Sequence, residues 1–256
     1  MTAPPFDLNG RTALITGSSS GLGARFARML AAQGVNVVAG ARRLDRLTVL
    51  ADEIRAVGGR IEPVEMDVED EASIIAAYDR AEQAFGVVDT IIANAGINAQ
   101  GPATDLPVDD LSQLLRINVQ GVFLTAREGA RRLIASPDPT RGRIILLGSV
   151  GSLRPLAGLT AYSTSKAGVA MLGKGLAREW ARHGINVNTI CPGWIVTELN
   201  AEWLAGEGGQ KLIKTFPRRR VMNPDDLDGI VTFLASDASR TITGGVFAAD
   251  DGQVLA

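Results

Sequence analysis

Apolar residues follow two patterns along this chain, and the two alternate from one end to the other. Short runs rich in β-branched residues predict strands, and longer stretches with apolar residues three or four apart predict helices. The predicted strands are Thr12–Thr16, Asn36–Ala39, Ile61–Glu65, Thr90–Ala93, Arg143–Leu147, Asn186–Ile190 and Val246–Ala249. The predicted helices are Leu22–Gln33, Leu44–Val57, Glu71–Phe85, Leu111–Ile134, Ser163–Arg182 and Asp225–Ser236.

The alternation predicts an α/β fold with a Rossmann-type, doubly wound sheet. The strands are apolar without strict alternation, which suits a mostly parallel, seven-stranded sheet covered by helices on both faces. Regular strand–helix repeats imply right-handed crossovers. We find no linker or internal repeat, so residues 1–256 form one predicted domain. The rhythm loosens only at about 194–223, after the sixth strand, and we expect a substrate lid there because ligands bind beyond the carboxyl ends of such strands.

Composition narrows the possible chemistry. The 256 residues include one His and one Cys, which excludes a Cys/His zinc site and a disulfide framework, and no metal is expected. Cys191 is interpreted as a reduced residue without a base placed to activate it. A net charge of −2 gives no electrostatic reason to expect nucleic acid or an anionic membrane. The start of the chain lacks a signal-peptide pattern, and we expect a cytoplasmic protein.

A glycine-rich turn follows the first predicted strand. The segment Thr16-Gly17-Ser18-Ser19-Ser20-Gly21-Leu22-Gly23 leads directly into a predicted helix. Small residues would let backbone N–H groups and the helix N-terminus approach a pyrophosphate. The spacing differs from the G-x-G-x-x-G fingerprint, and the alternative is an ordinary capped turn between a strand and a helix.

The end of the second strand bears on the choice of dinucleotide. An acidic residue about 20 positions beyond the glycines would bind the ribose of NAD, but Ala41 stands 20 positions after Gly21. Arg42 and Arg43 follow, and guanidinium groups match a 2′-phosphate. We therefore predict NADP(H) preference with NAD(H) possible. The alternative is that these arginines are solvated at a helix start.

Tyr162 and Lys166 lie four positions apart on a predicted helix and so share a face. A free phenol has a pKa of roughly 10, and a nearby ammonium would make it a useful proton donor or acceptor. The chain has four lysines and two tyrosines; the second tyrosine, Tyr78, falls in a helix that we predict to be surface-type. The alternative is an ordinary helix with an exposed Lys and a packed Tyr.

Other polar residues occur where strands end. Ser149 ends the fifth predicted strand, and Asn94-Ala95-Gly96 closes the fourth with small residues that would permit close approach of a cofactor. Asn118 falls inside a long predicted helix, where an amide is not the favoured filler. An Asn there is either exposed or used to hold a water or a side chain.

Taken together, these motifs resemble the single-domain branch of the short-chain dehydrogenase/reductase family over essentially the whole chain. The matching segments, in family order and spacing, are the TGSSSGLG turn, Ala93-Asn94-Ala95-Gly96, Asn118, Ser149, Tyr162-Ser163-Thr164-Ser165-Lys166 and Cys191-Pro192-Gly193. The first residue of the second motif departs from the family's usual NNAG, which puts some strand-end hydrogen bonding in doubt.

The resemblance implies a catalytic tetrad and a nicotinamide cofactor. The implied catalytic residues are Asn118, Ser149, Tyr162 and Lys166. The implied cofactor-binding residues are Gly17, Ser19, Ser20, Gly21, Leu22, Gly23, Arg42, Arg43, Asp67, Val68, Asn94, Ala95, Gly96, Tyr162, Lys166, Pro192, Gly193, Ile195 and Thr197. Tyr162 would give the proton, Ser149 would bind the same oxygen, Lys166 would hold the ribose and lower the Tyr162 pKa, and Asn118 would anchor a water. The implied reaction is hydride transfer between a ketone and a secondary alcohol.

The substrate is predicted from the residues near the site. Apolar residues in the loop after Ser149 and in the expected lid favour an apolar ketone or alcohol, unless they pack the lid or a subunit contact. They are Leu153, Leu156, Leu159, Trp194, Leu199, Trp203, Leu204, Leu212, Ile213 and Phe216. Arg154 is the charge best placed for a carboxylate, although a solvated arginine is the simpler interpretation. The run at 218–220 is interpreted as solvated or subunit-contacting arginines.

Two other functions are alternatives to ketone reduction, and the number of subunits is left open between a dimer and a tetramer. One rival is reduction of a 3-oxoacyl group on an acyl-carrier protein, for which Arg131, Arg132 and Arg178 offer a basic patch. The other is a non-catalytic NADP-sensing regulator, although such a protein would be expected to lose a tetrad residue. The resemblance further implies a homo-oligomer, a dimer or tetramer, formed through Leu111–Ile134 and Ser163–Arg182.

Overall fold

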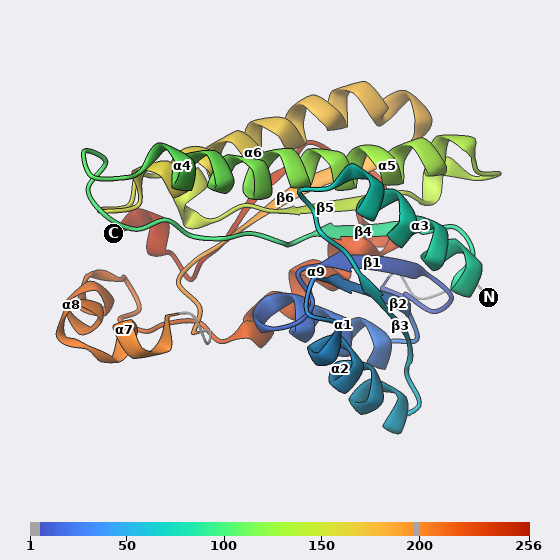
Figure 1. The fold of residues 1–256 in the computed structure, drawn as a ribbon, viewed down its shortest axis with the longest axis horizontal. Coiled ribbons are helices and arrows are strands. Elements are labelled where there is room, and N and C mark those ends of the chain that lie inside the picture. The colour runs from blue at the N-terminus through green and yellow to red at the C-terminus, as the bar shows by residue number, and fades with distance from the viewer. Residues whose placement is uncertain (1–5, 197–199) are drawn as a thin grey trace.

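The computed structural model describes residues 6–196 and 200–256, and its centre is a seven-stranded parallel sheet (Figure 1). The strands are β1 (Thr12–Thr16), β2 (Asn36–Ala41), β3 (Arg60–Glu65), β4 (Thr90–Ala93), β5 (Arg143–Leu147), β6 (Asn186–Pro192) and β7 (Val246–Ala249). Their order is β3-β2-β1-β4-β5-β6-β7, and every neighbouring pair is parallel. The predicted doubly wound fold is confirmed, and β2 and β6 each run two residues beyond their predicted ends.

Helices cover both faces of the sheet. They are α1 (Gly21–Ala32), α2 (Leu44–Ala56), α3 (Glu71–Phe85), α4 (Val108–Leu115), α5 (Val122–Ala135), α6 (Thr160–Trp180), α7 (Ala201–Ala205), α8 (Glu207–Thr215) and α9 (Asp228–Ala235). Figure 1 shows α1, α2 and α9 on one side and α3 to α6 on the other. Successive side chains of β1 enter two separate cores: Ala13 and Ile15 pack with the first group, and Leu14 with the second. Both faces are therefore buried, which explains why the strands do not alternate in polarity.

The long helix predicted over Leu111–Ile134 is interrupted. It begins earlier, at Val108, and a π-helical segment, Arg116–Gly121, separates α4 from α5. A Cβ on Gly121 would lie 2.9 Å from the side chain of Val68, so the π segment passes close to the residues after β3. Single π turns inside helices often occur at functional sites, and this one contains Asn118.

Tyr78 lies in the core, so the prediction of a surface-type helix is wrong. Its side chain is fully buried where α3 packs on α5, and its hydroxyl donates a hydrogen bond to the carbonyl of Thr125 at 2.9 Å. The guanidinium of Arg132 covers the ring, 5.5 Å from its centroid. Burial raises the pKa of Tyr78. The ring belongs to the buried face of α3. The many polar residues on the rest of this helix led to the wrong prediction.

After β6 the chain leaves the sheet and returns. The outgoing and returning arms meet at a parallel bridge between Ile195 and Met222, and α7 and α8 lie between them. Figure 1 shows these two helices standing apart from the sheet. The excursion occupies the place where the lid was predicted.

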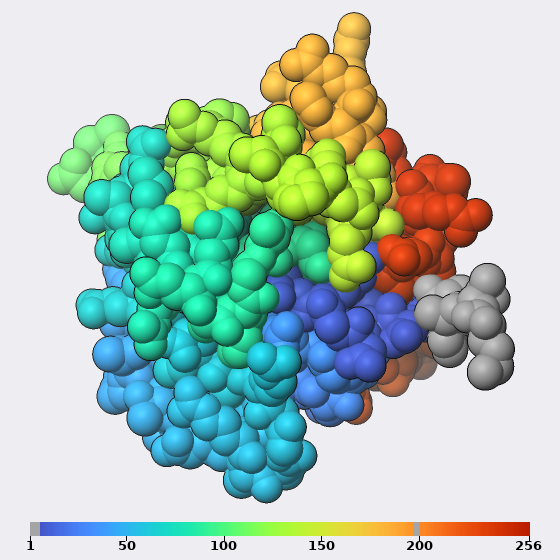
Figure 2. Space-filling model, turned by 90° about the vertical axis from the view of Figure 1, so that its right-hand side faces the viewer, coloured from blue at the N-terminus to red at the C-terminus, as the bar shows by residue number. Residues whose placement is uncertain are grey.

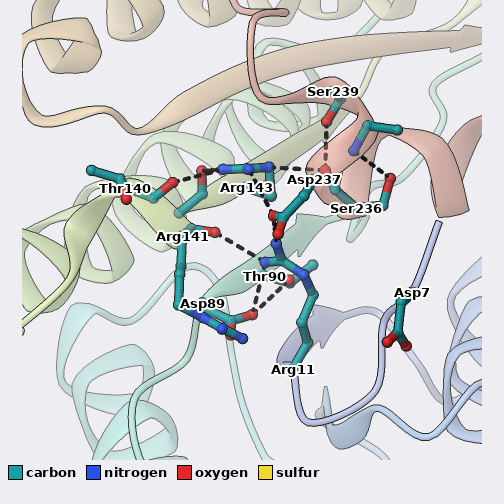
Figure 3. A network of polar contacts seen from close by, with 12 residues as sticks. Asp7, Arg11, Asp89, Thr90, Thr140, Arg141, Arg143, Ser236, Asp237 and Ser239 are labelled. Atoms are coloured by element: carbon teal, nitrogen blue, oxygen red, sulfur yellow. Dashed lines mark hydrogen bonds and ion pairs between the residues drawn. The ribbon is translucent and has the colours of Figure 1, made fainter. Parts of the chain in front are cut away.

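An ion cluster joins the other end of the sheet. Figure 2 shows this end, where segments from the beginning, middle and end of the chain lie together. Figure 3 shows Asp89 between Arg11 and Arg141, at 3.4 and 3.1 Å, and Asp237 beside Arg11 and Arg143. Arg11 precedes β1, Asp89 precedes β4 and Arg143 begins β5, so the cluster ties together the entrances of three strands.

Candidate active site

All the predicted site segments that the structure describes lie at the carboxyl edge of the sheet. The glycine turn follows β1, the arginine pair follows β2, and Asp67 and Val68 follow β3. Asn94–Gly96 follow β4, Ser149 follows β5, and Gly193 and Ile195 follow β6. The strand order reverses between β1 and β4, where a crevice forms at such an edge. Thr197 lies outside the described residues.

The glycine turn is packed so tightly that two of its glycines are required. Gly17 has a φ of +70°, and a Cβ there would lie 2.9 Å from the Cα of Ala95. A Cβ on Gly23 would lie 2.4 Å from the carbonyl oxygen of Gly17. No side chain fits at either contact, so the turn holds its backbone against the segment after β4.

Asn94 joins that segment to the turn. Its side-chain Nδ2 donates to the carbonyl of Thr16 at 2.9 Å, and its backbone N–H donates to the Thr16 hydroxyl at 3.0 Å. The backbone N–H of Ala95 reaches the same hydroxyl at 3.0 Å. Ala93, where the family more often has Asn, is buried inside β4. The strand-end bonding that the departure placed in doubt is therefore made by Asn94.

The start of α1 has the properties of an anion site. Ser20 precedes the helix without a side-chain cap, and the first turn contains no acidic residue. A Cβ on Gly21 would meet nothing within 4 Å, so open space faces this N-terminus. Uncapped N–H groups at the start of a twelve-residue helix attract phosphate. The turn thus fits the pyrophosphate of a dinucleotide.

Arg43 lies directly on this turn. Its Nη2 donates to the hydroxyls of Ser19 and Ser20 at 2.8 and 3.0 Å. Arg42 is exposed. Of the two predicted phosphate ligands, the structure thus places Arg43 at the turn.

The residues after β3 border the same crevice. Val68 is buried beside the π segment, and Asp67 accepts a hydrogen bond from the backbone N–H of Glu69 at 3.0 Å. Asp67 also donates its own backbone N–H to the hydroxyl of Ser73 at 2.9 Å. These contacts fix the loop that carries two of the implied cofactor-binding residues.

Tyr162 and Lys166 share one face of α6, as predicted. Lys166 is buried, its Nζ lies 5.8 Å from the centroid of the Tyr162 ring, and it donates to the carbonyl of Leu147 at 2.8 Å. Burial lowers the pKa of Lys166 to about 8. The alternative of an exposed lysine is excluded.

Burial also raises the pKa of Tyr162, and a hydrogen bond with Ser149 opposes that rise. The predicted lowering of the Tyr162 pKa by Lys166 is not seen, because burial sets the direction of the shift. The phenol of Tyr162 therefore holds its proton at neutral pH and can donate it.

Ser152 connects two tetrad residues, and sequence reasoning missed it. Its hydroxyl accepts the backbone N–H of Ser149 at 3.1 Å and donates to the carbonyl of Lys166 at 2.8 Å. The Ser149 hydroxyl in turn accepts the N–H of Gly151 at 3.0 Å. The signal was present in the serines three positions apart, a spacing typical of helix caps.

Asn118 is fully buried in the π segment. Its Oδ1 accepts the N–H of Ile97 at 2.8 Å, and its Nδ2 donates to the Ile97 carbonyl at 2.9 Å and to the Ser165 hydroxyl at 3.1 Å. A Cβ on Gly96 would lie 3.2 Å from Asn118 Oδ1 and 3.4 Å from Lys166 Nζ. Asn118 therefore joins the segment after β4 to α6, beside the ammonium of Lys166. Its predicted role in holding a water remains a prediction.

The end of β6 carries the last predicted contacts. Cys191 and Pro192 are buried in β6, and burial raises the pKa of the Cys191 thiol. A Cβ on Gly193 would lie 2.6 Å from Oε1 of Gln253, so the chain terminus packs against this segment. Gln253 also accepts a hydrogen bond from Arg154 at its carbonyl. Arg154 therefore has a protein partner, and the interpretation of a solvated arginine is wrong. Sequence reasoning missed Gln253.

The apolar residues near the site divide into two groups. Leu159, Leu204 and Phe216 are buried, so they pack the loop and the excursion, as the alternative interpretation held. Leu153 and Trp203 are 42% and 41% exposed, and Trp203 stacks on Trp194 with ring centroids 5.4 Å apart. Leu199 lies outside the described residues.

The arginine run at 218–220 is exposed, but two of its members are paired. Arg218 and Arg220 form ion pairs with Asp251, and all three residues border a hollow of about 510 Å³. Among residues 6–196 and 200–256, no group of three or more His, Cys, Asp or Glu side chains is placed to hold a metal ion. In the same part of the chain, no helix combines the length and apolar character needed to cross a membrane.

Comparison with known proteins identifies relatives along the whole chain. The model of the short chain dehydrogenase family matches residues 11–208. Oxidoreductase UcpA of Salmonella typhimurium is 37% identical, over 97% of this chain and 96% of that protein. 3beta-hydroxysteroid dehydrogenase 1 of Eggerthella lenta is 38% identical, over 97% and 95%. The structure of a gluconate 5-dehydrogenase from Burkholderia cenocepacia J2315, in complex with NADP and tartrate, has a TM-score of 0.93 and 36% identity over 98% of each chain.

Proposed function

The chain belongs to the short-chain dehydrogenase family, and on that premise we propose that it interconverts a ketone and a secondary alcohol by hydride transfer with NADP(H). The observation that carries the proposal is the arrangement of Tyr162, Ser149 and Lys166 at the carboxyl edge of the sheet. Ser149 follows β5, which lies next to β4 and two strands from β1, the strand that the glycine turn follows. A protonated phenol, a hydroxyl and a buried ammonium at one such edge suit proton transfer to a carbonyl oxygen.

The proposed mechanism assigns proton handling to this chain's own residues. Tyr162 gives its proton to the substrate oxygen as negative charge develops there, and Ser149 donates a hydrogen bond to the same oxygen. Lys166 uses one N–H on the carbonyl of Leu147, which leaves two donors for ribose hydroxyls. When bound, the nicotinamide supplies or accepts the hydride.

NADP(H) preference is supported by the position of Arg43. Its guanidinium already lies on Ser19 and Ser20, in the proposed phosphate-binding turn directly before α1. A 2′-phosphate at that place would receive paired N–H donors from the guanidinium. The Burkholderia relative was crystallised in complex with NADP.

An apolar substrate is supported by the exposed residues beside the site. Leu153 follows the tetrad serine, and the stacked pair of Trp194 and Trp203 begins the excursion. The name of the Eggerthella relative indicates a steroid alcohol, which is a substrate of this kind. An acyl-carrier protein receives less support, because Arg132 is engaged by Asp79, Glu82 and Glu128, and Arg131 lies 3.7 Å from Glu128.

Self-association through α4 to α6 is supported by an apolar groove of about 550 Å³ between these helices, lined by Leu115, Val119, Phe123 and Leu172. Met171, beside it, is 67% exposed. A second copy covering this groove would bury these side chains. The cytoplasmic location stays a prediction.

The test of the proposal is oxidation of NADPH and NADH with a panel of alicyclic, aromatic and sugar ketones, together with the reverse reaction. We expect turnover of an apolar ketone with a lower KM for NADPH than for NADH. Cofactor binding without turnover of any substrate would favour the NADP-sensing alternative. Activity confined to carrier-protein thioesters would favour the 3-oxoacyl reductase.

A further inference from the structure

Residues 250–255, near the end of the chain, contact three segments that surround the proposed site. We call residues 250–255 the tail. It follows β7 and packs against the end of β6, where a Cβ on Gly193 would meet Gln253 Oε1 at 2.6 Å and Asp250 Cα at 3.0 Å. The carboxylate of Asp250 accepts the backbone N–H groups of Gly252 and Val254 at 3.0 and 2.6 Å. The tail is therefore a defined turn held by its own hydrogen bonds.

Gln253 links two of these segments through different atoms. Its side-chain Oε1 accepts the backbone N–H of Trp194 at 2.6 Å, where the chain leaves β6. Its backbone carbonyl accepts Nη1 of Arg154 at 3.2 Å, from the loop that follows Ser149. Gln253 is only 2% exposed, so both contacts are shielded from water. One buried residue thus joins the loop that carries Ser149 to the start of the excursion.

Asp251 holds the third segment, the returning arm of the excursion. Its two carboxylate oxygens pair with Arg218 Nη1 at 2.9 Å and Arg220 Nε at 2.7 Å. The carboxylate side chain is 7% exposed. Among the residues that the structure describes, the non-glycine residues with positive φ are Arg219 at +50° and Asp251 at +57°. Such conformations persist where surrounding contacts enforce them, and here Asp251 forms the two ion pairs while Arg219 lies between its two arginine partners in the chain.

The two arms that the tail holds are joined to each other. Beside the bridge between Ile195 and Met222, the N–H of Met222 donates to the carbonyl of Trp194 at 3.0 Å. Trp194 then stacks on Trp203 of α7. The outgoing arm, 194–196, is held by Gln253, and the returning arm, 218–222, is held by Asp251. The position of α7 therefore depends on two residues of the tail, Asp251 and Gln253.

We propose that Gln253 and Asp251 are positioning residues that fix the arms of the excursion beside the substrate site. This inference rests on the proposed function only for its effect on catalysis. Neither residue is proposed to touch the reacting atoms. Loss of either contact lets the excursion move, which weakens substrate binding and leaves the chemistry of Tyr162 in place.

The first test needs no activity. Gln253→Met keeps the side-chain length and removes the acceptor for Trp194, and Asp251→Asn keeps a residue that tolerates positive φ but removes the charge. Trypsin cleavage at Lys211, Lys214 and the arginines of 218–220 is followed by mass spectrometry, and the stacked tryptophans are followed by fluorescence. We expect cleavage in this region to accelerate at least fivefold in both variants, with an altered emission spectrum.

The matched control is Glu207→Gln. It removes an exposed ion pair with Lys211 inside α8 and leaves both arms held. Its cleavage rate should stay within twofold of the wild type. Unchanged cleavage and fluorescence in the tail variants, with melting temperatures close to the wild type, would overturn the proposal. Equal acceleration in the control would do the same.

The second test separates this inference from the proposed reaction. With a ketone that the wild type reduces, Gln253→Met and Asp251→Asn should raise KM for the ketone at least fivefold and change kcat by less than threefold. A fall in kcat at unchanged KM would contradict a positioning role. Absence of any wild-type turnover would refute the proposed function, whereas the proteolysis result would still decide whether the tail holds the arms.

Discussion

Arg43 donates from Nη2 to the hydroxyl of Ser19 at 2.8 Å, across 24 positions of the sequence. The contact joins the end of β2 to the glycine turn after β1, because these strands are parallel neighbours in the sheet. A cation is thereby placed beside the start of α1, whose uncapped N–H groups already favour an anion. In this structure the guanidinium of Arg43 donates to serine hydroxyls. Phosphate oxygens accept hydrogen bonds from a guanidinium more strongly than hydroxyls do.

Arg43→Gln tests this relationship. We expect KM for NADPH to rise by roughly 10- to 100-fold, because a lost charge-assisted contact is worth about 1.5–3 kcal/mol. KM for NADH should change by less than about threefold, since NADH lacks the 2′-phosphate. Arg42→Gln is the control, because the hydrogen bonds to Ser19 and Ser20 come from Arg43, and loss of Arg42 should affect NADPH less. Steady-state kinetics with both cofactors decide the matter, and equal effects on NADPH and NADH would refute a phosphate contact.

Tyr162→Phe removes the proposed proton donor. We expect kcat to fall by about 10²- to 10⁴-fold, the usual contribution of general acid catalysis. NADPH binding, measured by fluorescence titration, should persist. Tyr78→Phe offers a matched control with the same atomic change, because Tyr78 is buried far from this chemistry and bonds to Thr125. It should retain activity and lose about 1 kcal/mol of unfolding free energy. Turnover of Tyr162→Phe at the wild-type rate would rule out its role.

Much of this site could be predicted because it depends on local spacing and sheet topology. The four-residue step from Tyr162 to Lys166 holds on any helix, and strand ends meet at one edge in any parallel sheet. The same rules correctly predicted the seven strands and the glycine turn. They could not show that Lys166 is buried or that Asn118 lies in a π segment, because both depend on packing.

Other features were missed because their partners are distant in sequence. Gln253 meets Trp194 across 59 positions, and nothing near either residue indicates the contact. Tyr78 was misassigned because its helix carries many polar residues, whereas its own position faces α5. Whether Arg42 or Arg43 faces the turn likewise depends on how β2 ends, which spacing alone does not resolve.

The pH dependence of stability tests the burial of Lys166. Burial lowers its pKa from 10.5 to about 8. Between these values the unfolded chain binds more protons than the folded one, so the free energy of unfolding gains from Lys166 as pH rises through this window. Below pH 8 the cost of burying the charge is fully present. Urea unfolding gives the free energy of unfolding of the wild type and of Lys166→Met. The wild-type value minus the variant value should increase by ~3 kcal/mol from pH 8 to 10.5. Taking the difference cancels the groups that titrate alike in both proteins. A difference independent of pH would contradict a lowered pKa.

The ion cluster at the amino ends of the strands gives a prediction for stability alone. Asp89 is buried between Arg11 and Arg141 and also accepts the hydroxyl of Thr90 at 2.8 Å (Figure 3). The side chains of Arg11 and Arg143 are 4% and 3% exposed, whereas Asp237 is 71% exposed. Asp89 is therefore the buried counter-charge of this cluster.

Asp89→Asn should lower the free energy of unfolding by about 3–5 kcal/mol, because it leaves the buried guanidinium of Arg11 with the exposed carboxylate of Asp237 in place of a buried one. Burial lowers the pKa of Arg143, and the neighbouring Arg11 lowers it further, whereas Asp237 and Asp89 oppose this shift. Glu53→Gln breaks the exposed pair with Arg28 and should cost less than about 1 kcal/mol. Urea unfolding of both variants at pH 7 makes the comparison. Equal losses would mean that the buried cluster contributes no more than a surface ion pair, and that the entrances of β1, β4 and β5 are held by packing alone.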